Sequence, residues 1–71
     1  MDLSDKQITI SMLAINSFPP QTKATVSVNK EVLEGVFQTI GSYELVFNET
    51  FGSIADPALQ QAIYDKLSLI P

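Results

Sequence analysis

The sequence contains no cysteine, no histidine, no tryptophan and no arginine among its 71 residues. Without cysteine the chain has no disulfide framework and no thiolate metal site, so we expect an intracellular, cytoplasmic protein. The lack of histidine and cysteine also removes the commonest general base, the soft metal ligands and the thiol nucleophile. These absences favour a protein that is not an enzyme and that holds no metal ion or cofactor.

Long apolar runs and clustered positive charges are also missing. No stretch approaches the roughly 20 apolar residues that cross a bilayer, and the first residues lack the basic and apolar regions of a signal peptide. Four basic against eight acidic residues give a net charge of -4. Phosphate binding needs clustered cations, and base recognition depends largely on arginine. We therefore expect neither a membrane nor a nucleic acid as partner.

The remaining ionisable groups and glycines form no recognisable catalytic pattern. Glu31 and Glu34 lie three residues apart, but two carboxylates without a third ligand are typical of a solvated surface. The three glycines are isolated and match no phosphate-binding loop. The sequence therefore offers no site for acid-base, metal or nucleotide chemistry.

The apolar content is sufficient for a packed fold. Hydrophobic residues make up 45% of the chain and charged residues 17%, which is too apolar for a disordered protein. We expect one small domain over residues 1–71, with residues 1–6 disordered. A domain of this size buries only about 60% of its unfolded surface, so a partner or a second copy would help to stabilise it.

The clearest helical pattern covers residues 29–41. Asn29 suits the N-cap position, and Gly41 suits the left-handed position that ends a helix. Gly35, inside the segment, costs a helix about 1 kcal/mol relative to alanine. The pattern predicts an amphipathic helix whose single apolar arc consists of Val32, Leu33, Val36, Phe37 and Ile40.

Alternation of apolar and polar residues predicts strands over residues 23–28 and 43–48. Residues 7–15 fit a strand or a helix, because Ser4 and Gln7 also match a capping box, and we favour the strand. The three strands then share one apolar face, which consists of Ile8, Ile10, Met12, Ala14, Ala24, Val26, Val28, Tyr43, Leu45 and Phe47.

A second helix is predicted after residue 55. Asp56 suits its N-cap, and Pro57 its first position, where the missing amide hydrogen is not needed. A helix between the second and third strands predicts a βαβ crossover with those strands parallel. The expected fold is α+β: a small two-layer sandwich in ββαβα order, with a three-stranded mixed sheet and two helices on one face. The buried stripe of the second helix is Leu59, Ala62, Ile63, Leu67 and Ile70.

The leading hypothesis is a non-enzymatic protein-protein interaction module, such as a small acidic regulator, adaptor, inhibitor or accessory subunit. Leu13, Ile15 and Val46 fall on the otherwise polar face of the predicted sheet, and Phe18 lies in a polar loop. Exposed apolar patches and open strand edges are surfaces that proteins use for association. We expect these four residues to bind a protein partner or a second copy, as a homodimer.

An alternative hypothesis is a small carrier of an apolar ligand. Such a ligand would bind between the C-terminal helix and the sheet, against Met12, Phe47, Phe51 and Tyr64. Pockets of this kind usually measure about 300 Å³ or more, which is large for so small a core. The sequence alone leaves the partner, and the choice between the two hypotheses, open.

Overall fold

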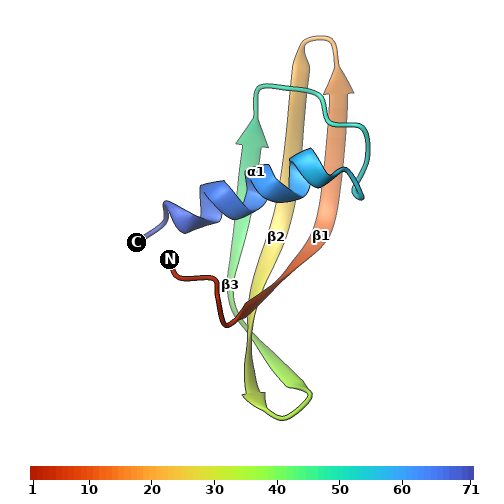
Figure 1. Cartoon of the computed structure of the whole chain (residues 1–71). Coiled ribbons are helices and arrows are strands. Elements are labelled where there is room, and N and C mark those ends of the chain that lie inside the picture. The colour runs from red at the N-terminus through yellow and green to blue at the C-terminus, as the bar shows by residue number, and fades with distance from the viewer.

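The computed structural model describes all of residues 1–71 and shows three strands followed by one helix (Figure 1). The strands are β1 (Lys6–Ser17), β2 (Pro20–Leu33) and β3 (Val36–Phe47), and the helix is α1 (Pro57–Ser68). Both strand pairs are antiparallel, and the order in the sheet follows the sequence, β1-β2-β3. The helix crosses one face of the sheet, so the fold has two layers (Figure 1).

The predicted ββαβα order, with a mixed sheet and two helices, is therefore wrong. Residues 29–41 form the end of β2, a tight turn and the start of β3. Glu34 and Gly35 make the turn, and Gly35 has a φ of +75°, which favours glycine. The apolar residues lie symmetrically around this turn, a spacing that suits a hairpin as well as a helix. With no helix between them, β2 and β3 need no crossover and pair antiparallel.

The core forms where α1 packs on the central strand. Ala24, Val26 and Val28 of β2 are fully buried, as predicted for this strand. The predicted C-terminal helix is confirmed: Asp56 accepts a hydrogen bond from the Ala58 amide at 2.9 Å, and Pro57 is the first helical residue. The buried stripe of the helix is Leu59, Ile63 and Leu67, with Ala62 and Ile70 partly buried against the same cluster.

The N-terminal residues, which we expect from the sequence to be disordered, contact this core. Leu3 is 5% exposed and belongs to the buried cluster. The α-amino group of Met1 donates hydrogen bonds to the carbonyls of Ser68, at 3.0 Å, and Ile70. A positive charge is favourable at the C-terminal end of a helix, where carbonyl groups lack partners. The first residues therefore close one end of the core.

A β-bulge in β1 changes which residues of this strand face the core. Residues 7–15 do form a strand, but the register shifts between Ile10, which pairs with Val26, and Met12, which pairs with Thr25. Ser11 is the extra residue, and its hydroxyl donates to the Thr25 carbonyl at 3.1 Å. Because side chains alternate along a strand, one inserted residue moves all later side chains to the opposite face.

The faces predicted for the second half of β1 are therefore reversed. Leu13 pairs with the buried Ala24 and packs against the core, so it is not on the open face of the sheet. Ile15 pairs with the fully buried Thr22, on the same side as Leu13. Met12, predicted to be in the core, is 69% exposed on the open face.

Replacing Leu13 and Met12 in turn tests this reversal. Leu13→Lys places a charge against the core and should lower the free energy of unfolding by about 2 kcal/mol. Met12→Lys, the matched control, should change it by less than about 0.5 kcal/mol. Chemical denaturation followed by circular dichroism measures both values. A larger loss for Met12→Lys than for Leu13→Lys would place the bulge elsewhere or remove it.

The cap of α1 makes stability depend on pH in the acid range. The backbone amides of Gly52 and Ala58 donate to the Asp56 carboxylate and lower its pKa below the ordinary aspartate value. Its stabilising effect is therefore complete above roughly pH 4 and is lost as the pH falls through the lower folded-state pKa. Asp56→Asn keeps an N-cap acceptor but does not titrate. The variant should be less stable than the unmodified protein at neutral pH, and denaturation curves of the two should converge in acid. A stability difference that stays constant with pH would contradict this role.

Candidate functional site

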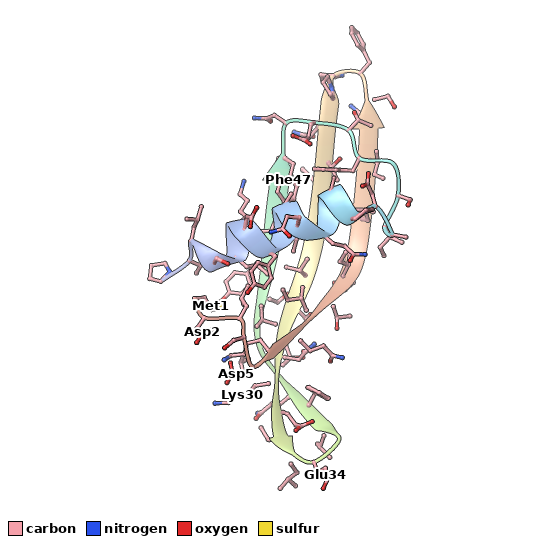
Figure 2. All side chains as sticks on the ribbon, in the orientation of Figure 1. Met1, Asp2, Asp5, Lys30, Glu34 and Phe47 are labelled. Atoms are coloured by element: carbon pink, nitrogen blue, oxygen red, sulfur yellow. The ribbon has the colours of Figure 1, made fainter.

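The β2–β3 hairpin extends beyond the part of the sheet that the other elements cover. β1 begins at Lys6, opposite Lys30, so the hairpin past this point has no third strand. It points away from α1 (Figure 1), and Glu34 lies at its tip (Figure 2). We call residues 31–37, which lie past this point on both strands, the arm.

The arm exposes apolar side chains, and only Phe37 among them lines a pocket with residues of the N-terminal segment. Cross-strand pairing places Leu33 opposite Val36, and Glu31 opposite Phe37. Because Val36 and Phe37 are neighbours in one strand, their side chains project from opposite faces. The arm is therefore apolar on both faces. The apolar arc predicted to be the buried side of a helix is instead exposed, at 49% for Val32, 70% for Leu33, 50% for Val36, 47% for Phe37 and 51% for Ile40.

The overall dimensions reflect this extension. The radius of gyration is 12.8 Å, against about 11 Å for a compact domain of this length. The accessible surface is 4738 Å², against about 4,400 Å² for a monomer of this mass. The molecule measures 43 × 22 × 18 Å, and the arm lies along its long dimension (Figure 1). The chain thus keeps apolar surface that a compact fold would bury.

A polar network fixes the base of the arm. Asn29, predicted to be a helix N-cap, is instead a strand residue that is 8% exposed. Its amide nitrogen donates to the Thr9 hydroxyl at 3.1 Å, and its oxygen accepts from the Thr39 hydroxyl at 2.7 Å. These bonds join all three strands on the open face of the sheet. They hold the hairpin to the sheet at the point where β1 begins.

A second feature is a groove between β1 and α1, with a volume of about 740 Å³. Ile8 and Ile10 lie on its sheet side, and Ile54, Gln61 and Tyr64 are among the residues on its other side. The groove also contacts Thr9, whose side chain lies on the open face, so it reaches the backbone edge of β1. No charged residue lines the groove. It is therefore uncharged and borders an unpaired strand edge.

The opposite edge of the sheet is partly closed by Lys66. Its ammonium group donates to the carbonyl of Val46 at 2.9 Å and lies 5.1 Å from the centre of the Phe47 ring. A lysine at a strand edge blocks pairing with another chain at that point. β3 is thus protected near its end, whereas its part within the arm has no such cover.

The residues predicted to bind a partner do not form one surface. Leu13 and Ile15 lie on the helix side of the sheet, and Val46, 36% exposed, lies on the open side next to Lys23. Phe18, 93% exposed, lies in the β1–β2 turn, at the end of the sheet away from the arm (Figure 1). The predicted patch is therefore replaced by the arm and the groove as candidate sites.

The residues predicted to line a ligand cavity are also separated. Met12 is on the open face, and Phe51 is buried in the core. Phe47 packs edge-to-face on Phe51, with ring centres 5.7 Å apart. Of the four residues, only Tyr64 lines the groove.

No group of three or more acidic side chains is arranged to hold a metal ion. No helix has the length and apolar character needed to span a membrane.

No protein-family model, curated protein or solved structure matches this chain. The arm does have a signal in the sequence that helix periodicity obscures: Glu34-Gly35 is flanked on each side by a pair of large apolar residues. A glycine-containing pair between such residues is typical of a hairpin.

Replacing Gly35 tests the turn that forms the tip of the arm. An added methyl group would meet no atom within 4 Å, so the cost of Gly35→Ala comes from its φ of +75° alone. We expect Gly35→Ala to destabilise the folded arm by about 1 kcal/mol. Hydrogen exchange of the arm amides should then be about fivefold faster, with exchange of the α1 amides unchanged. Gly35→Asn, the control, should exchange more slowly than Gly35→Ala because asparagine tolerates this conformation. Equal exchange in all three proteins would contradict the turn geometry.

Proposed function

We propose that this chain is a protein-protein interaction module that binds its partner through the arm. The observation that carries the proposal is the exposure of four large apolar side chains, Val32, Leu33, Val36 and Phe37, on a hairpin that extends past β1. Exposed apolar side chains that cluster in this way on a small protein mark an interaction site. The proposal keeps the class of function expected from the sequence and moves the contact surface to the arm.

The backbone of the arm favours a protein as the occupant. Past Lys30, β2 has no neighbour on the β1 side, and β3 has none on its outer side. These edges present amide and carbonyl groups that a partner strand can pair with. A bilayer interior would leave the same groups without hydrogen bonds, at several kcal/mol each. A net charge of -4 without arginine disfavours a nucleic acid.

The residues that stabilise the fold are separate from the exposed residues of the arm. The nine buried hydrophobic residues that hold the fold together all lie outside the arm. Substitutions in the arm should therefore change binding more than stability. This separation makes the proposal testable without unfolding the protein.

Site-specific photo-crosslinking tests the proposal. A photoreactive phenylalanine analogue at position 33 should give a discrete crosslinked product in cells that produce the protein. The analogue at position 69 is the control, because Leu69 is 84% exposed but lies after α1, away from the arm. Adding Phe37→Lys should reduce the position-33 product about tenfold, which corresponds to a loss of about 1.4 kcal/mol in binding. No product at position 33, or the same product from position 69, would overturn the proposal.

A small apolar ligand remains a second candidate, supported by one observation. The groove lies between α1 and the sheet, where the alternative hypothesis places a ligand, and its volume of about 740 Å³ is within the range of ligand pockets. Native mass spectrometry after mild purification tests it. A retained small molecule that Ile54→Lys releases would support the carrier, and a ligand-free chain would count against it.

A further inference from the structure

Two surfaces of this chain lack a cover, and their chemistry is complementary. The arm is apolar on both faces and has open strand edges. The groove between β1 and α1 has no charged lining and borders the open edge of β1. Within one molecule the two do not meet, because the arm points away from α1 (Figure 1). Neither surface is therefore covered by the other within one chain.

We propose that the partner of the arm is a second copy of this chain, and that the arm of each copy occupies the groove of the other. This inference rests on the proposed function and identifies the protein that the arm binds. The two contacts are identical and related by a two-fold axis, so the assembly closes as a dimer.

The groove suits a strand of the arm in both its backbone and its side chains. An extended segment that pairs with the free edge of β1 projects every second side chain from one face. Leu33 and Val36 share a face of the arm and are uncharged, as is the groove lining that receives them. Glu34 lies at the tip of the hairpin, so its carboxylate stays in water beyond the groove (Figure 2).

The area favours a reciprocal dimer over a single contact. At roughly 200 Å² for a whole large residue, Leu33 and Val36, on the face that enters the groove, present about 240 Å². One arm in one groove then buries about 500 Å² in total, which is below the size of a specific interface. Two such contacts bury about 1,000 Å², the lower limit for a specific interface. The closed dimer therefore reaches an area that one contact does not.

Three lysine variants test the proposal. Leu33→Lys blocks the arm and leaves the groove intact, and Ile54→Lys does the opposite. Ile54 is 53% exposed, so a lysine there is compatible with folding. Leu69→Lys is the control, with the same change at an 84% exposed position outside both surfaces. Circular dichroism and thermal unfolding establish that each variant is folded, and Gln61→Lys replaces Ile54→Lys if that variant is not.

Sedimentation velocity then measures association. The unmodified protein and Leu69→Lys should form dimers with equal affinity, and Leu33→Lys and Ile54→Lys should each associate at least about tenfold more weakly. An equimolar mixture of the last two has one intact contact, in which the Ile54→Lys arm meets the Leu33→Lys groove. The mixture should therefore associate more strongly than either variant alone and more weakly than the unmodified protein.

Three other outcomes would overturn the proposed dimer. A strict monomer at high concentration overturns the dimer, whereas the crosslinking experiment still decides whether the arm binds another protein. Loss of association in Leu33→Lys alone, with Ile54→Lys unaffected, places the arm against a different surface and also overturns the proposal. A mixture that associates no more strongly than either variant alone also overturns the proposal.

Discussion

The packing of α1 on β2 is the interaction on which the rest of this structure depends. Three leucine and isoleucine side chains on one side of the helix meet three small or β-branched side chains of the central strand, and all six are at most 2% exposed. The larger side chains of the helix fill the space above the smaller side chains of the strand. The other contacts, from Leu3, Leu45 and Phe51, extend this cluster at its margins.

The size of one helix also explains why part of the sheet is left uncovered. The strands have 12 to 14 residues, which at about 3.3 Å per residue gives lengths of about 40 Å or more. A helix that crosses the strands covers a width of only about 10 Å, including its side chains. The loop before α1 adds cover on the side of the β1–β2 turn, and the N-terminal segment adds cover on the other side of α1 (Figure 1). No segment remains for the far end, where the arm lies (Figure 1).

Much of this architecture is accessible from the sequence, and the failures have identifiable physical causes. The C-terminal helix carries both a cap and a stripe, and residues 23–28 alternate without interruption, so both are predicted correctly. In residues 29–41 the same apolar spacing fits a helix and a hairpin, and Gly35 decides between them through its backbone conformation. In β1 one extra residue, Ser11, reverses the second half of the strand. The arm has a turn signal at Glu34-Gly35 that the helical spacing obscures, and the groove has none, because it depends on where the helix crosses β1.

The polar junction at Asn29 separates the molecule into a part that maintains the fold and a part that is free to vary. None of the buried hydrophobic cluster lies beyond this junction, so the distal hairpin can accept new side chains at small energetic cost to the remainder. The exposed surface of the arm can therefore change while the scaffold stays the same. A designer could use the same division to graft other loops at residues 31–37 onto an unchanged base.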